Sequence, residues 1–130
     1  EEQHTGEGNG RRERKIMIEK TVIKYLSEKL KPVPVLMEYP EKMDSTPYVV
    51  MEKTGSGEYN CIKSATIALQ SVEESLQKAA ELNETVKAAM DELAELRGIG
   101  AVSLNSDYNF TDSTTKQYRY QAIYNITYCE

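Results

Sequence analysis

The chain has 130 residues, a formal net charge of −5, a hydrophobic content of 39% and a charged content of 28%. These values fit one soluble globular domain with a single core rather than a disordered chain. The acidic balance argues against a nucleic-acid binder, whose affinity comes mainly from lysines and arginines that neutralise phosphates. No apolar run approaches the ~20 residues of a membrane span, and no charged-then-apolar segment near the N-terminus indicates a signal peptide.

The first fifteen residues contain no apolar side chain; glycines fill their first part and basic residues their second. We expect a flexible, disordered extension over 1–15, followed by a single α+β domain over 16–130. The alternative for the extension is a basic arm that docks on an acidic partner or on nucleic acid.

The first predicted element is a helix over 16–30, because apolar residues repeat every four positions along one face: Ile18, Val22, Leu26 and Leu30. Pro32 and Pro34 predict its end, since the residue before a proline is driven out of the helical region. A short strand over 33–38 and a proline-bounded loop over 39–47 follow.

Two strands, over 48–53 and 61–71, come next. The intervening 54–60 segment contains Gly55 and Gly57 and predicts a hairpin turn. Apolar residues at the odd positions of the second strand place one of its faces in the core.

A long helix is predicted from 72 to about 96. Ser71 and Glu74 match a capping box at its start, and Gly98 matches a left-handed stop after its end. Asn83 is a point where this helix could bend or break.

The chain closes with strands over 101–110 and 117–128 around a polar turn at 111–116. Along the last strand, apolar and aromatic residues alternate with mostly polar ones, so that they share one face. This face carries four tyrosines: Tyr118, Tyr120, Tyr124 and Tyr128. We expect this face to pack under the helices with the hydroxyls at the rim. A protein-protein interface is an alternative, and a base-stacking surface is disfavoured because no basic groove accompanies it.

The predicted fold class is therefore α+β, in the order α-β-β-β-α-β-β. Hairpin-linked strands with two amphipathic helices indicate an antiparallel sheet of about four to five strands with both helices packed on one face.

Residues with catalytic potential are few. The sole histidine is His4, and Cys61 and Cys129 lack both a metal-ligand spacing and a basic neighbour in the sequence. The Gly55-Ser56-Gly57 segment lacks the lysine and the following helix of a phosphate-binding loop. We predict no catalytic residue, no metal ligand and no cofactor, and therefore no enzyme.

Several segments together resemble a known family: the helix "IEKTVIKYL", the strand "YVVMEKTGSGEYN" and the ending "SLNSDYNFTDSTTKQYRYQAIYNITY". Over about 16–128 the chain resembles the small tail-completion and tail-terminator proteins of long-tailed bacteriophages and prophages. The resemblance implies a subunit of a hexameric ring at the head-proximal end of the tail. Such a ring stops tail-tube polymerisation and joins the tail to the head.

The partners implied are other copies of the chain, the tail-tube protein and a head-completion or connector protein, with DNA only passing through the lumen. The location implied is the virion tail, and the host cytoplasm during assembly. One alternative is a head-tail connector component of the same size. Another is a monomeric or dimeric adaptor that binds a host or phage protein.

A ring subunit needs two different surfaces that meet head to tail. In the 105–117 connection, Tyr108 and Phe110 form an aromatic pair within a polar loop, which is typical of a partner anchor; the alternative is that Phe110 folds back onto the sheet. The predicted protein-protein contact residues are Met43, Tyr48, Glu58, Tyr59, Tyr108, Phe110, Asp112, Lys116 and Arg119.

Overall fold

The computed structural model describes residues 17–41 and 45–129. Its elements are, in chain order, α2 (Met17–Lys29), β1 (Val35–Leu36), β2 (Tyr48–Tyr59), β3 (Ile62–Glu73), α3 (Leu76–Asp91), the 3-10 turn η1 (Leu93–Glu95), β4 (Ile99–Asn109) and β5 (Tyr118–Tyr128). The predicted α+β class and the order α-β-β-β-α-β-β are confirmed. The predicted extension over 1–15 lies outside the described residues.

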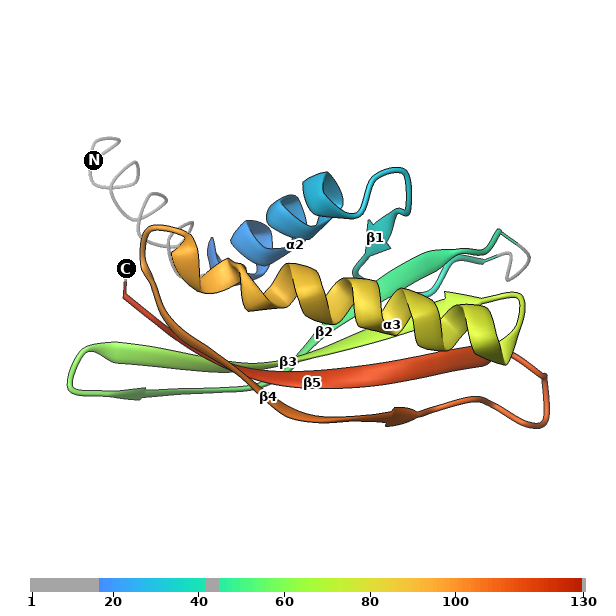
Figure 1. The fold of residues 1–130 in the computed structure, drawn as a ribbon. Helices are drawn as coiled ribbons and strands as arrows, with labels where there is room; N and C mark the ends of the chain where they lie inside the picture. The colour runs from blue at the N-terminus through green and yellow to red at the C-terminus, as the bar shows by residue number, and fades with distance from the viewer. Residues whose placement is uncertain (1–16, 42–44, 130) are drawn as a thin grey trace, which may run out of the picture.

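The five strands form one sheet in the spatial order β1-β2-β3-β5-β4. β1 pairs with β2 in parallel, and the other neighbours pair antiparallel. The last strand of the chain therefore lies inside the sheet, between β3 and β4. Figure 1 shows α2 and α3 over the same face of the sheet, as the sequence predicts. We call this the helix face and the opposite one the back face.

The main core lies between the helices and the helix face, and it buries the predicted apolar stripe of α2. Among the predicted tyrosines, Tyr124 and Tyr128 are buried in this core, whereas Tyr118 and Tyr120 are half-buried near the other end of β5. The predicted packing under the helices is thus confirmed for the first pair. Burial of an aromatic ring of this size contributes roughly 2–3 kcal/mol through the hydrophobic effect.

A second, smaller core lies on the back face. It consists of Tyr48, Val50 and Val72, and Leu36 and Tyr39 pack against it. Because Leu36 and Tyr39 cover the back face here, the last residues of β3 are buried on both faces of the sheet. The sequence indicates burial of only one face of this strand.

The predicted turn over 54–60 is wrong. β2 continues through these residues to Tyr59, and the chain reverses at Asn60 and Cys61, whose φ angles are 51° and 66°. A two-residue hairpin turn that follows the twist of its strands requires positive φ at both central residues, and asparagine tolerates it better than most. Gly55 instead follows a register shift after Lys53 within the strand.

The predicted N-cap at Ser71 is also wrong. β3 pairs with β5 through Glu73, so Ser71 is a buried strand residue opposite Tyr120. The N-cap is Ser75, whose side-chain oxygen accepts a hydrogen bond from the backbone N–H of Lys78. The capping pattern depends only on neighbouring residues in the chain. It therefore contains no information about the pairing of β3 with β5, which continues for two residues beyond Ser71.

The other element boundaries differ by smaller amounts. β1 has two residues where six were predicted over 33–38, and α3 ends at Asp91 rather than near 96. The helix passes through Asn83 without a break. Gly98 has φ of 91°, the left-handed conformation predicted for it, but it follows η1 instead of the helix itself.

Candidate functional site

Arg119, near the start of β5, lies between two aromatic rings on the back face. Its guanidinium carbon is 5.5 Å from the ring centroid of Tyr39 and 4.7 Å from that of Phe110. Tyr108 packs edge-on against Phe110, with the ring centroids 6.0 Å apart. We call these four residues the arginine-aromatic cluster. A cation over an aromatic face is attracted by the negative charge density of the ring, by roughly 0.5–1 kcal/mol at exposed sites.

Hydrogen bonds fix the guanidinium in this position. Arg119 Nε donates to the backbone oxygen of Phe110 at 2.7 Å. Its Nη1 donates to the Tyr39 hydroxyl at 2.9 Å and to Gln117 Oε1 at 2.8 Å. Burial raises the pKa of the Tyr39 hydroxyl, while the neighbouring Arg119 acts in the opposite direction. The cluster therefore ties the loop after β1 to the hairpin between β4 and β5.

The predicted aromatic anchor, Tyr108 and Phe110, thus lies on the sheet instead of projecting freely. The two residues keep 41% and 36% of their surface exposed, so they remain accessible as part of a fixed surface. Two buried amides hold Tyr108 from behind: Gln70 Nε2 donates to Gln121 Oε1 at 2.7 Å, and Gln121 Nε2 donates to the Tyr108 hydroxyl at 2.6 Å. This arrangement favours a rigid contact surface, because little side-chain freedom is left to lose on binding.

An open cleft of about 570 Å³ adjoins the cluster. It lies between the end of β3, the turn before β5 and Tyr39, and its lining residues are Tyr39, Thr46, Val72, Glu73, Glu74, Asp112, Thr115, Lys116, Gln117, Tyr118 and Arg119. The lining joins apolar ring surfaces to groups of both charges, which suits a polar or amphipathic segment of another chain.

Two acidic groups of the cleft are engaged within the chain. The Asp112 carboxylate accepts a hydrogen bond from the backbone N–H of Thr114 at 3.0 Å, and a hydrogen bond from the Thr115 side chain lowers its pKa most. Glu74 forms a hydrogen-bonded ion pair with Lys78, which lowers the pKa of Glu74. Lys116 is exposed, has φ of 58°, and forms no salt bridge with any residue in the described part of the chain.

Tyr48, another predicted contact residue, is buried in the back-face core. Gln117 Nε2 donates a hydrogen bond to the Tyr48 hydroxyl at 3.2 Å. Tyr48 therefore packs beneath a residue that lines the cleft and is not itself exposed to a partner. Met43 lies outside the described residues.

Glu58 and Tyr59 lie far from the other predicted contact residues, where β2 turns into β3. Tyr59 is 79% exposed, and Ile62, its partner across the hairpin, is half exposed. We call residues 58–62 the hairpin tip. Figure 1 shows this turn reaching beyond the ends of both helices. The structure therefore divides the predicted residues between two surfaces, with the tip and the cleft at opposite ends of β3.

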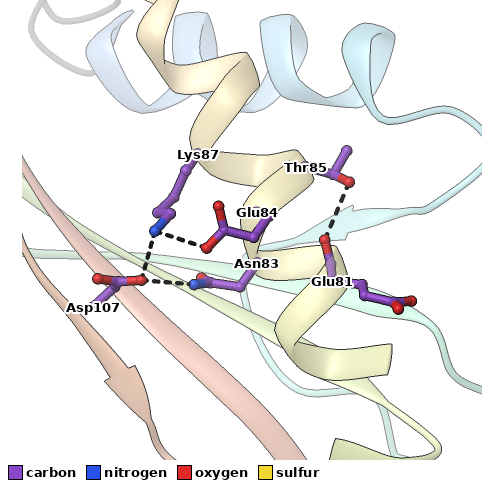
Figure 2. A network of polar contacts seen from close by, with 6 residues as sticks. All are labelled: Glu81, Asn83, Glu84, Thr85, Lys87 and Asp107. Atoms are coloured by element: carbon purple, nitrogen blue, oxygen red, sulfur yellow. Dashed lines mark hydrogen bonds and ion pairs between the residues drawn. The ribbon is translucent and has the colours of Figure 1, made fainter. Parts of the chain in front are cut away.

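A polar clamp, made of Asn83, Lys87 and Asp107, joins α3 to the edge strand β4 (Figure 2). Asp107 Oδ2 accepts hydrogen bonds from Asn83 Nδ2 at 3.0 Å and from Lys87 Nζ at 2.9 Å. The hydrogen bond from Lys87 is the main reason that the pKa of Asp107 is lowered, and the same contact raises the pKa of Lys87. The pair is therefore ionised at neutral pH and holds the edge strand in place.

The sequence interpretation missed this clamp and Tyr39. A signal for the clamp exists, because Asn83 falls on the buried stripe of the helix that otherwise carries Ala79, Val86 and Met90. A polar residue on such a stripe needs a partner from another element. No comparable signal marks Tyr39.

Cys61 and Cys129 are both free and exposed. Within 17–41 and 45–129, no group of three or more acidic, histidine or cysteine side chains could hold a metal ion. No helix of the described chain has the length and apolar character to cross a membrane. Comparison with protein-family models and with curated proteins finds no match to this chain.

Proposed function

We propose that this chain is a structural virion protein that assembles head to tail into a ring, with the hexamer as the expected form. In this proposal the ring lies at the head-proximal end of a phage tail, where it ends tail-tube polymerisation and joins the tail to the head. The place in the tail rests on the sequence resemblance over about 16–128. The ring is implied by the same resemblance, and the arrangement of exposed surfaces in the structure supports it.

One observation carries the assembly: a single rigid sheet presents two exposed and unlike surfaces at its opposite ends, the hairpin tip and the cleft. Contacts between unlike surfaces repeat from copy to copy, and they close into a ring when the rotation between copies divides a full turn. Two like surfaces would instead favour a twofold dimer.

The net charge of −5 supports the proposed passage of DNA. A lumen lined with acidic groups repels phosphates, so DNA can pass without being retained. A lumen lined mainly by lysine and arginine in the assembled ring would contradict this part of the proposal.

The test is the mass and shape of the purified chain in solution. Light scattering after size exclusion and native mass spectrometry should give particles of about six times the 14.7 kDa chain mass, and negative-stain images should show rings. Addition to the polymerising tail-tube protein of the same genome should shorten the tubes and place the rings at one end.

Two results would change the proposal. Rings that bind the head connector and leave tube length unchanged would favour a connector component. A chain that stays monomeric or dimeric at all concentrations, alone and with the tube protein, would overturn the ring and favour the adaptor.

A further inference from the structure

We infer that the hairpin tip of one copy inserts into the cleft of the next copy, so that the two surfaces are the two halves of one repeated contact. This inference rests on the proposed function, because it names the contact that would build the ring. The occupant of the cleft is a second copy of this chain, and the inserted segment is 58–62.

The tip has the properties of an inserting element. Tyr59 and Ile62 are directly opposite in the β2–β3 ladder and so lie on the same face of the hairpin. Both are large apolar or aromatic side chains, and both are exposed. Tyrosine is among the residues that dominate interface energies. The ladder is already formed, so insertion costs little ordering entropy.

The cleft has room for a side chain of the tip and a lining that suits one. Its volume of about 570 Å³ falls within the range of roughly 300–1,000 Å³ that is typical of sites that enclose small ligands. The rings of Tyr39 and Tyr118 supply apolar surface, and the hydroxyls and amides of the lining can accept or donate hydrogen bonds. A tyrosine, which is apolar along its ring and polar at its end, matches this combination.

One pair of opposite charges can form between the two surfaces. In the cleft, the carboxylates of Glu73, Glu74 and Asp112 all take part in contacts within their own chain, and Lys116 is an exposed cation of the lining. At the tip, Glu58 is exposed and lies 3.7 Å from Lys63. A surface pair at this distance contributes little, so Glu58 can turn to Lys116 of the neighbouring copy at small cost.

The contact can form only between copies. The tip and the cleft are separated by the length of β3, which has 12 residues. At roughly 3.3 Å per residue this strand is about 40 Å long. A tip therefore cannot reach the cleft of its own chain, and each copy must give its tip to one neighbour and receive a tip from another.

Cross-linking through the natural Cys61 tests the contact directly. In a Cys129→Ser background, Glu74→Cys adds one thiol at the lining of the cleft. Under mild oxidation we expect a ladder of disulfide-linked oligomers on a non-reducing gel, up to the size of the ring. The matched control is Ser103→Cys, an exposed position of β4 that does not line the cleft, and it should give no ladder.

Two sets of substitutions test the energetics. Tyr59→Ala should raise the concentration at which half of the rings dissociate by about tenfold, with an unchanged thermal transition of the monomer because the side chain is exposed. Glu58→Lys and Lys116→Glu should each weaken assembly, and the double variant should recover it.

The possible outcomes separate the two proposals. Rings that form without the Cys61–Glu74→Cys ladder, and that are insensitive to Tyr59→Ala, would overturn the inference and leave the proposed function standing. Absence of any oligomer in the unmodified chain would overturn the proposed function, and the inference with it.

Discussion

Removal of the shared acceptor in the polar clamp, by Asp107→Ala, should destabilise the protein. The substitution takes away the oxygen to which Asn83 and Lys87 donate, at 3.0 and 2.9 Å. Asn83 is only 1% exposed, and its Oδ1 already has no hydrogen-bond partner among the described residues. The variant would therefore leave the entire buried amide unpaired.

The expected magnitude follows from these contacts. A buried amide without partners costs about 1–3 kcal/mol. The ion pair adds at most about 1 kcal/mol, because the side chains of Lys87 and Asp107 keep 21% and 26% of their surface exposed. We expect a loss of about 2–3 kcal/mol in the free energy of unfolding, which corresponds to a fall of roughly 10 °C in Tm for a chain of this size.

Urea denaturation followed by circular dichroism measures this loss. The matched control is Glu84→Ala, which removes the other, exposed partner of Lys87 and leaves Asp107 in place; it should change the stability by less than about 0.5 kcal/mol. If Asp107→Ala is no more destabilising than Glu84→Ala, the clamp does not hold the fold together and the reasoning fails.

The pH dependence provides a second check on the same residue. The hydrogen bond from Lys87 lowers the pKa of Asp107 in the folded state. Its stabilising contribution is thus complete above the unfolded pKa of about 3.9 and is lost as the pH falls through the lower folded value. The wild type should lose more stability than Asp107→Asn on acidification through this window.

Three further predictions concern single residues. Ser75→Ala should lower the free energy of unfolding by about 1 kcal/mol, because it removes the N-cap. Ser71→Ala should leave that free energy unchanged or raise it, because the buried Ser71 hydroxyl has no partner in the described chain. A lower urea midpoint for Ser71→Ala than for Ser75→Ala would instead identify Ser71 as the N-cap. Cys61→Gly should raise the free energy of unfolding by about 0.5–1 kcal/mol, since φ is 66° there, and an unchanged or lower midpoint would contradict this. Burial raises the pKa of Tyr124 to about 12, so its stabilisation is complete below the unfolded pKa of about 10 and is lost as the pH rises through the folded value. An ultraviolet titration of the wild type against Tyr124→Phe should show the missing tyrosine near the upper value; a missing component near 10 would exclude the shift.

Strong local periodicity made some elements predictable to within one residue. The first helix, expected over 16–30, is Met17–Lys29, and the last strand, expected over 117–128, is Tyr118–Tyr128. In both, the alternation of apolar and polar residues follows the geometry of one element and needs no partner to be recognised. The turn was misplaced for the opposite reason: glycines at 55 and 57 are strong turn signals, yet the ladder with β3 extends past them.

In the candidate site, too, some residues could be predicted from the local sequence and others could not. Sequence reasoning selected Tyr108 and Phe110 as an aromatic pair in a polar loop, and it also selected Arg119 near the start of the last strand. It could not select Tyr39, which is 80 positions from Arg119 in the chain and becomes its neighbour only in the fold. Nor could it separate the tip from the cleft, because their distance depends on the direction of β3 in the sheet.

By itself, then, the sequence determined the α+β class, the order of elements and the face of β5 that enters the core, because each follows from local periodicity. Only the tertiary structure decided which residues meet on the back face. The strand order β1-β2-β3-β5-β4 inserts the last strand between two earlier ones, and this pairing depends on long-range packing that no local pattern records. It sets Arg119 between Tyr39 and Phe110 and fixes the tip and the cleft at opposite ends of one sheet.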